Sequence, residues 1–492
     1  RRGSIMVGIL GANSVSGGYE IDNSLRFNND DSPKLTFTPG SAGNRRTFTL
    51  SVWFKLQAGT TGERVLLAAD DGTGDNNNFD YFALNPGDKL IMYGYEGGSE
   101  NQSIITTQLL RDPSAWYHFV VAVDTTQGTA ANRVKFYLNG SQITAFDTAN
   151  YPSQNFQTRI NNNNAQRISS YPDQDVSYFD GYMAEYHLVD GSAKAPSDFG
   201  ETDDNGVWIP KAYTGSYGTN GFYLEFKETG GGQNSSGIGA DTSGNDHHWA
   251  VTNFAATDVT TDTPTNNFCT FSPLQLTTGA VVLSEGNTLI TMDGAANYSG
   301  QHGTIGVSNG KWYWEMKAID SSVVMIGALT LNSTPRGDNT SDGSGNGMYY
   351  YYANTHYQSN ETTIRRSNAG NGSLGNSAVS GGSNSVSNLS DNDIVQIALD
   401  MDNNKIYFGL NGTFVNSSNP ADGTNSFTLH TDVSNPVSPY AGADGGQVSA
   451  NFGNPSFAIS SGNADANGYG NFEFAVPSGY YSLCTKNLAE FG

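Results

Sequence analysis

Hydrophobic and polar residues alternate with a period of two in short runs along the chain. Two stretches, residues 116–146 and 393–415, follow the same plan: an alternating strand, an acidic polar turn, a second alternating strand and then Asn-Gly. Asn139-Gly140 and Asn411-Gly412 favour type I′ hairpins, because both central residues of that turn need φ > 0. Each stretch therefore predicts a β-meander.

Further alternating runs, separated by turn-forming residues, predict strands in both halves of the chain. They lie near residues 24–28, 48–54, 65–67, 81–84 and 179–188 in the first half, and near 311–317, 326–328, 438–440 and 448–453 in the second. The pattern indicates an all-β fold of two antiparallel β-sandwich (jelly-roll) domains.

The length of 492 residues fits two such domains, because a single all-β domain rarely exceeds about 250 residues. We expect an N-terminal arm at 1–20, a first sandwich at 21–200 and a second at 281–492. Residues 201–280 are rich in Gly, Thr and Asn and predict a connector, with one docked strand at 221–226.

The charge balance argues against a nucleic-acid partner. The chain has 47 acidic and 24 basic residues and a net charge of −23, so a phosphate backbone would be repelled. The apolar run at residues 5–10 is too short for a signal-peptide core or a membrane span, so we expect no membrane insertion. The two cysteines, Cys269 and Cys484, either pair as one staple or remain buried free thiols.

The order of motifs in the first half resembles a known fold family. The segments FTLSVWFK, WYHFVVAVD, VKFYLNG and FDGYMAEYHLVDG, within roughly residues 20–200, resemble the concanavalin A-like jelly-roll domains of the laminin-G and pentraxin type. In the second half, GKWYWEM, DIVQIALDMDNNKIYFGLNG and ANFGNPSF resemble SPRY domains.

The combination of these domains is similar to virion proteins of marine tailed bacteriophages, as are the opening GILGANSVSGGYEIDNSLRFN and the C-terminal LCTKNLAE. This resemblance implies a fibre, spike or surface decoration on the virion, which is extracellular once released. The implied partners are other copies of the chain, for instance in a trimer, other virion proteins and cell-surface polysaccharide.

Concanavalin A-like folds also include glucanases, which need a pair of carboxylates about 5–5.5 Å apart across the glycosidic bond. The nearest match, Glu20-Ile21-Asp22, lacks the third acidic position of the Glu-x-Asp-x-(x)-Glu pattern. We therefore expect a protein without enzymatic activity.

A loop at residues 69–78 offers the carboxylates of Asp70, Asp71 and Asp75 among glycines. Ca²⁺ prefers six to eight oxygen ligands, and laminin-G and pentraxin relatives bind it through such loops, so calcium is the candidate cofactor. An ordinary solvated turn explains the loop equally well. His247-His248 is a poor metal site, because adjacent residues of a strand point to opposite faces.

Four consecutive tyrosines, residues 349–352, form the most conspicuous aromatic run. Tyrosine rings can stack on sugars, and alternation in a strand would send Tyr350 and Tyr352 to one face as candidate ligand-binding residues. The alternative is that these rings pack in the core.

These observations lead to one functional hypothesis and two alternatives. The chain is expected to be a non-enzymatic bacteriophage virion structural protein that mediates subunit contacts and binds host-surface glycans. The alternatives are a secreted carbohydrate-binding adhesin or lectin that acts alone, and a glycan-cleaving depolymerase.

Overall fold

The structure is a computed structural model of the whole chain. It describes residues 18–73, 77–171, 175–273, 281–292, 299–331, 348–354, 361–366, 389–429, 435–443 and 445–492. Most of the predicted N-terminal arm, residues 1–17, lies outside this description.

The described chain forms two compact units, one at Ser16–Thr265 and one that contains Asn266–Gly492. The division falls inside the stretch that the sequence assigns to a connector. Residues 201–265 belong to the first unit, so most of this stretch is part of a folded body.

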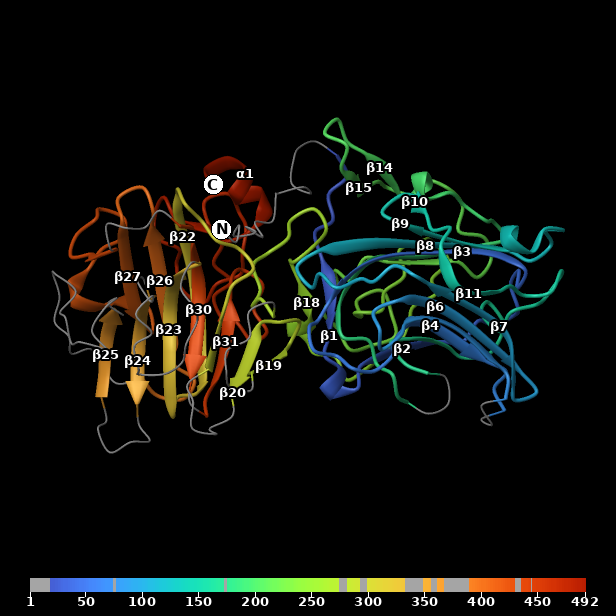
Figure 1. The fold of residues 1–492 in the computed structure, drawn as a ribbon, viewed down its shortest axis with the longest axis horizontal. Helices are drawn as coiled ribbons and strands as arrows, with labels where there is room; N and C mark the ends of the chain where they lie inside the picture. The colour runs from blue at the N-terminus through green and yellow to red at the C-terminus, as the bar shows by residue number, and fades with distance from the viewer. Residues whose placement is uncertain are drawn as a thin grey trace, which may run out of the picture. The chain divides into compact units, whose positions relative to one another are not determined.

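The first unit is a sandwich of two antiparallel sheets, seen as two layers in Figure 1. Sheet A contains, in spatial order, β10 (Ser141–Gln142), β9 (Val134–Leu138), β8 (Trp116–Asp124), β3 (Thr47–Leu56), β13 (Gly181–Asp190), β1 (Ser24–Phe27) and β18 (Val259–Thr260), with β16 (Phe222–Leu224) paired to β13. Sheet B contains β11 (Phe146–Asn150), β7 (Ser99–Thr106), β6 (Leu90–Glu96), β5 (Phe79–Leu84), β4 (Arg64–Asp70), β12 (Gln166–Ile168), β2 (Lys34–Phe37) and β17 (Ala250–Thr252). A separate pair is formed by β14 (Gly200–Thr202) and β15 (Trp208–Pro210).

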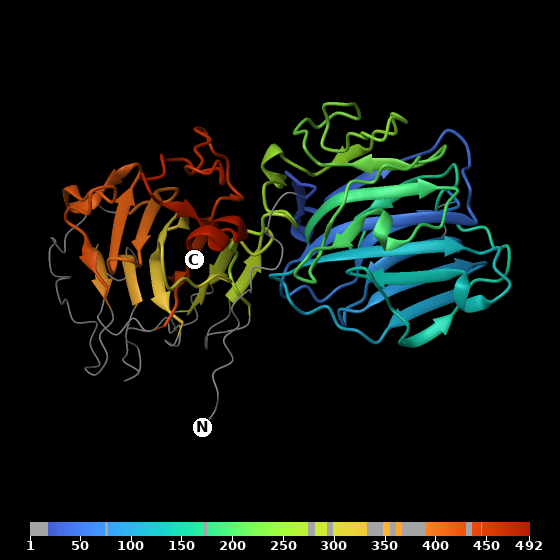
Figure 2. The same cartoon turned by 90° about the horizontal axis from the view of Figure 1, so that it is seen from above.

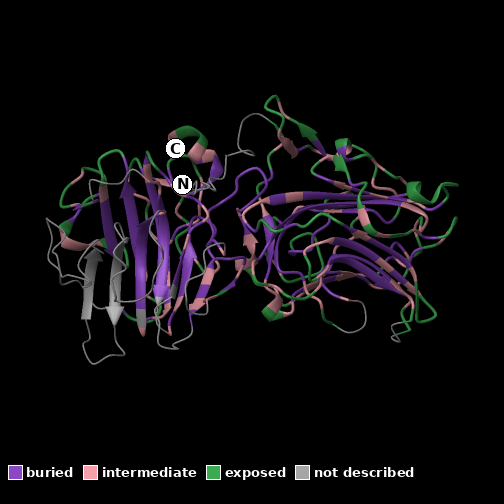
Figure 3. Ribbon diagram, in the orientation of Figure 1, coloured by how far each residue is buried: buried purple, intermediate pink, exposed green. Residues whose placement is uncertain are grey.

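The main core of the first unit lies between these sheets. Alternation along β3 sends Val52 and Phe54 into it, while Trp53 packs in a separate cluster with Trp116 and Tyr182. Figure 3 shows how continuous the buried positions are along the strands. Both sheets therefore bury side chains on both faces.

Both predicted meanders are present, and their hairpins have the expected geometry. Asn139 and Gly140 have φ of 46° and 79°, and Asn411 and Gly412 have φ of 47° and 87°. Each pair is the two-residue turn of a hairpin, because Leu138 pairs with Ser141 and Leu410 pairs with Thr413.

The second unit has a nine-stranded and a five-stranded sheet, and Figure 2 shows their strands running side by side. The larger sheet contains β19 (Val281–Ser284), β20 (Leu289–Met292), β31 (Gln447–Asn451), β22 (Lys311–Asp320), β26 (Ile394–Asp400), β27 (Lys405–Leu410) and β28 (Thr413–Phe414), with β29 (Phe427–Thr428) on β27 and β32 (Tyr481–Ser482) parallel to β22. The smaller sheet contains β21 (Ser299–His302), β30 (Val437–Ala443), β23 (Val323–Thr330), β24 (Met348–Asn354) and β25 (Glu361–Arg366).

Helical structure is sparse in the described residues. The α-helix α1 (Thr485–Phe491) follows β32, and single 3-10 turns occur at Asn29–Asp31, Ala130–Asn132, Pro196–Asp198, Ala256–Asp258 and Val415–Ser417. None of the helices in the described part of the chain has the length and apolar character needed to cross a bilayer. The all-β prediction is confirmed.

The two cysteines are both buried and free. Cys269 donates its backbone N–H to the carbonyl of Leu483, the residue before Cys484. Of the two alternatives left by the sequence, the structure has the pair of buried thiols.

Candidate functional site

Aromatic side chains gather on the outer face of sheet B in the first unit. The adjacent strands β5 and β6 place Phe79 opposite Tyr95 and Tyr81 opposite Tyr93. Alternation sends Phe82 and Met92 into the core, so the four aromatic side chains point to the other face. Two cross-strand aromatic pairs therefore lie next to each other on one face.

The rings of these pairs are in contact. Phe79 and Tyr95 stack with centroids 4.7 Å apart and planes 15° apart, and Tyr81 and Tyr93 lie 5.7 Å apart at 37°. Directly opposite aromatic pairs of this kind stabilise antiparallel sheets. The same contacts that hold the two strands in register also hold the ring positions.

A fifth ring, Tyr171, comes from the segment after β12 and packs edge-on against the sheet. Its centroid lies 4.8 Å from that of Tyr81 at 75° and 6.2 Å from that of Phe79 at 82°. The Tyr171 hydroxyl donates a hydrogen bond to Glu63, which fixes the ring position. We call Phe79, Tyr81, Tyr93, Tyr95 and Tyr171 the aromatic platform.

Tyr81 is 4% exposed and forms the base of the platform. The other four residues of the platform are half-buried. Beside Tyr171 lies Val176, which is 43% exposed and accepts the Tyr171 backbone N–H. Half-exposed aromatic faces offer apolar surface with polar hydroxyls at the edge, which suits the C–H and hydroxyl groups of a sugar ring.

The platform hydroxyls are proton donors at neutral pH. Burial, together with the negative charges of Glu100 and Glu63, raises the pKa of both Tyr93 and Tyr95 above the ordinary tyrosine value. Each hydroxyl can therefore donate and accept hydrogen bonds.

Gly94 separates Tyr93 from Tyr95 and faces the interior. A Cβ at this position would lie 2.2 Å from the Gln102 side chain and 2.4 Å from Asp80 Oδ1. Gln102 donates to Asp80 directly beneath the glycine. The Tyr-Gly-Tyr sequence thus combines two outward rings with an inward space that a buried polar pair fills.

A polar pocket of about 470 Å³ lies at the ends of the strands of the same unit. Its lining comes from the segments at Arg45, Asp71 and Glu96 and from the loop at residues 155–164. In sheet B, β4 and β6 lie on either side of β5 and run in the same direction, so Asp71, directly after β4, and Glu96, the last residue of β6, lie at the same edge of the sheet (Figure 1).

The predicted calcium loop is only partly described. Asp70 Oδ1 accepts the Gly72 N–H at 2.9 Å, and Asp71 Oδ1 accepts the Thr73 N–H at 3.1 Å and the Thr73 hydroxyl at 2.7 Å. Asp75 lies outside the described residues. Within the residues that the structure describes, no three His, Cys, Asp or Glu side chains are grouped to hold a metal ion. The calcium site stays a prediction.

Tyr350 and Tyr352 lie on β24, a strand of the second unit. Tyr350 pairs with Gly327 and Arg365, and Tyr352 pairs with Met325 and Thr363. Their side chains are outside the described part of the structure, so their role in ligand binding stays a prediction.

His247 and His248 have separate structural partners. The ring Nδ1 of His247 lies 3.2 Å from the Gly221 carbonyl oxygen, and the Nδ1 of His248 accepts the Asp241 backbone N–H at 3.0 Å. The two rings thus serve different backbone contacts.

Two protein-family models match the chain. Residues 29–197 match the concanavalin A-like lectin/glucanases superfamily, and residues 311–455 match the SPRY domain. The chain therefore combines a concanavalin A-like domain of the laminin-G type with a SPRY domain, as the sequence motifs predict. A search of curated proteins found no match.

Several solved structures are similar to parts of this chain. A heptameric SAP-like pentraxin from Limulus polyphemus is 16% identical and covers 36% of this chain and 80% of that chain, with a TM-score of 0.28. The SPRY domain of human HERC1 is 14% identical and covers 37% of this chain and 96% of that chain, with a TM-score of 0.25. The PSpry domain of TRIM65 is 16% identical and covers 37% of this chain and 92% of that chain, with a TM-score of 0.26.

Proposed function

We propose that this protein is a non-enzymatic structural component of a bacteriophage virion surface that binds cell-surface glycans. The glycan part of the proposal rests on the aromatic platform of the concanavalin A-like domain. The virion part rests on the resemblance of the whole domain order, with its N- and C-terminal motifs, to virion proteins of marine tailed phages.

The platform supports glycan binding because its rings are already in place. Phe79 and Tyr95 are stacked across two paired strands, and Glu63 holds Tyr171. A ligand that stacks on such rings loses little affinity to ordering of the protein. Tyrosine also gives a large contact area with few rotatable bonds.

A virion role is consistent with the expected strength of such a site. A few stacked rings give weak binding to one sugar, and repeated copies on a particle multiply it. The proposed partners are other copies of this chain, other virion proteins and bacterial surface polysaccharide. The net charge of −23 keeps such a Gly- and Asn-rich β protein soluble.

The proposed lack of catalysis follows from the kind of contact that the platform makes. Stacking positions a sugar ring, whereas glycoside hydrolysis needs an acid and a nucleophile or base on either side of one bond. Two carboxylates lie beside the platform: Glu63 accepts the Tyr171 hydroxyl, and Glu100 is paired with Tyr95 across β6 and β7. We expect no reducing-sugar release when the protein is incubated with polysaccharides that it binds.

Glycan binding is tested with the full chain on an array of bacterial polysaccharides, followed by titration of the best ligand. Truncating one stacked ring in Tyr95→Ala should weaken binding about three- to tenfold. Tyr137→Ala is the matched control, because Tyr137 is a half-buried tyrosine that packs on the outer side of sheet A. Equal affinities of both variants and the wild type would remove the platform from the proposal.

The virion role is tested by labelling intact phage particles with an antibody against this chain. Label on the fibre, spike or capsid surface is the expected result. Protein found only free in the medium, still able to bind glycans, would favour the second candidate, a secreted adhesin or lectin. The platform would serve that function without any particle.

A further inference from the structure

The polar pocket near the aromatic platform has the composition of a second saccharide subsite. Acidic, amide and cationic side chains line it together with one aromatic ring: Arg45, Arg159, Asp71, Glu96, Asn162 and Phe156. Planar polar groups of these types are the ones that bind sugar hydroxyls and carboxylates. The pocket differs from the platform, which offers mainly aromatic faces.

Arg45 is the cation in this pocket whose hydrogen bonds go only to neutral groups. Its Nε donates to the Thr158 carbonyl at 2.5 Å and its Nη2 to the Gln157 carbonyl at 3.2 Å. Among the described residues, Nη1 of Arg45 has no hydrogen-bond partner and the guanidinium has no ion pair with a carboxylate. The guanidinium is half-buried and lines the pocket, so Nη1 is placed to receive an anionic group of a ligand.

The second cation, Arg159, reinforces the positive side of the pocket. Its Nη2 lies 3.2 Å from Asn78 Oδ1 and 3.4 Å from Glu96 Oε1, and the Glu96 side chain is 59% exposed. An ion pair with such an exposed partner is screened by solvent and weak. Burial and the positive charge of Arg159 lower the pKa of Arg45, and the negative charge of Asp80 opposes this shift.

The acidic groups of the pocket leave room for a ligand that carries hydroxyls as well as a negative charge. Asp71 uses Oδ1 for Thr73, and the buried Asp80 accepts the Arg159 backbone N–H at 2.5 Å from below. A chloride or sulfate ion would meet the carboxylates of Asp71 and Glu96 without offering them a proton. A sugar would offer hydroxyl protons to Asp71 and Glu96 and, if it is acidic, an anionic group to Arg45.

We propose that this pocket binds an acidic saccharide, with Arg45 as the residue that recognises the carboxylate of a uronate or the sulfate of a sulfated sugar. The proposal rests on the proposed glycan-binding function and specifies the class of glycan. The aromatic platform would then take neutral parts of the same polysaccharide.

The test compares three sets of oligosaccharides with the full chain by isothermal titration calorimetry: oligogalacturonates, sulfated galactose oligomers and neutral galactose oligomers of equal length. The wild type should bind one or both acidic sets at least tenfold more tightly than the neutral set, and 0.5 M NaCl should reduce this preference. Binding of one acidic set alone would identify the anionic group.

Arg45→Gln should lower the affinity for the acidic sets to that for the neutral set and so remove the preference, and Arg45→Lys should restore part of it. Arg133→Gln is the matched control, because Arg133 also donates only to backbone carbonyls, those of Gln127, Gly128 and Pro152, and does not line the pocket. Thermal unfolding of each variant checks that the loop at 155–164 is still folded.

Two outcomes would overturn the proposal. Equal affinity of the wild type for acidic and neutral sets, or an acidic preference that survives Arg45→Gln, would exclude Arg45 as the recognition residue while leaving glycan binding intact. Absence of binding to all three sets and to the polysaccharide array would overturn the proposed function and this proposal with it.

Discussion

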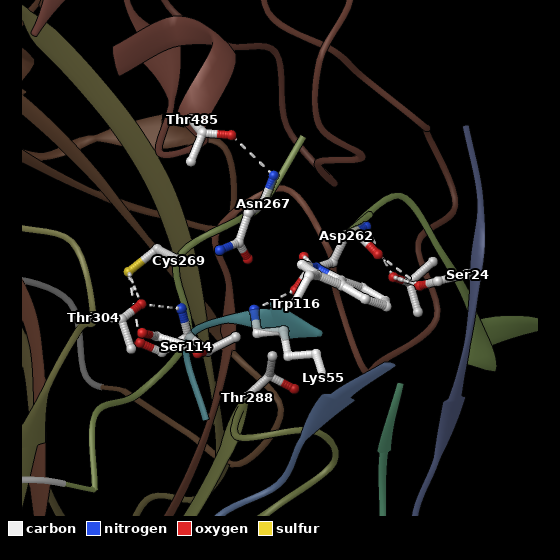
Figure 4. A network of polar contacts seen from close by, with 12 residues as sticks. Ser24, Lys55, Ser114, Trp116, Asp262, Asn267, Cys269, Thr288, Thr304 and Thr485 are labelled. Carbon is white, nitrogen blue, oxygen red and sulfur yellow. Dashed lines mark hydrogen bonds and ion pairs between the residues drawn. The ribbon is translucent and has the colours of Figure 1, made fainter. Parts of the chain in front are cut away.

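The ammonium nitrogen of Lys55 lies 2.8 Å from Oδ2 of Asp262, and both side chains are completely buried. Figure 4 shows the pair together with Trp116, whose indole N–H donates to the other oxygen, Oδ1, at 3.2 Å. Lys55 is on β3, and Asp262 follows β18 at the end of the same unit. The contact joins positions 207 residues apart in the sequence.

We predict that Asp262→Ala destabilises the first unit by about 3–5 kcal/mol, because it leaves the Lys55 charge buried without its carboxylate partner. Thermal and urea unfolding of the full chain measure the loss. The exposed pair Lys89–Asp147 is the control, and Asp147→Ala should cost less than about 1 kcal/mol. Similar small losses for both variants would contradict the prediction.

The Asn139-Gly140 turn should be intolerant of a side chain. Gly140 has φ of 79°, and a Cβ there would lie 2.4 Å from Cε3 of Trp208. Gly140→Ala should cost about 2 kcal/mol or more, from the left-handed backbone and from the displaced ring. Gly128→Ala, whose Cβ would meet no atom within 4 Å, should be nearly neutral in the same unfolding assay.

The stability of the first unit should fall as the pH rises from about 4 to 6. Burial raises the pKa of Asp80 from 3.8 to about 6, although hydrogen bonds from Arg159 and Gln102 oppose the shift. The folded state therefore holds a proton that the unfolded state releases in this range, so the contribution is present below pH 4 and is lost through pH 6.

The expected size of this change is on the order of 3 kcal/mol. Melting temperatures of the wild type and Asp80→Asn, measured between pH 4 and 7, test it. The variant should show a flatter dependence across this range. Parallel curves would show that Asp80 titrates equally in the folded and unfolded states.

The Tyr171 hydroxyl is expected to position the edge of the platform. Tyr171→Phe removes its hydrogen bond to Glu63 and keeps the ring, so we expect about a two- to threefold loss of glycan affinity and about 1 kcal/mol of stability. Tyr151→Phe is the control, because the Tyr151 hydroxyl has no hydrogen bond among the described residues. A loss of affinity in both variants would point to a general effect on the fold.

Local patterns predicted the strands well because each strand depends on its own residues. Alternation in WYHFVVAVD corresponds to β8 at Trp116–Asp124, and the two Asn-Gly turns take the predicted positive φ. The boundary between the two compact units could not be predicted from such local patterns. A Gly- and Thr-rich stretch reads as a linker, whereas Trp249 within it is fully buried in the first core.

The candidate site was harder to predict for a physical reason. Phe79, Tyr81, Tyr93 and Tyr95 occupy alternating positions in two short segments, and each segment alone is consistent with core packing. The prediction of ligand-binding residues was based instead on the more conspicuous run at Tyr349–Tyr352. The signal that was available is Tyr93-Gly94-Tyr95, where the central Gly faces Gln102 and Asp80.

The sequence by itself determined the alternation along the strands and the hairpin turns, because these depend on neighbouring residues. It also determined the two domain families, because their motifs occur along the chain in the order typical of each family. Only the tertiary structure decided which strands pair. The strand pairing places Phe79 opposite Tyr95, and the fold brings Lys55 into an ion pair with Asp262. Such contacts are long-range, and their energy comes from burial and register across segments that the linear sequence does not place together.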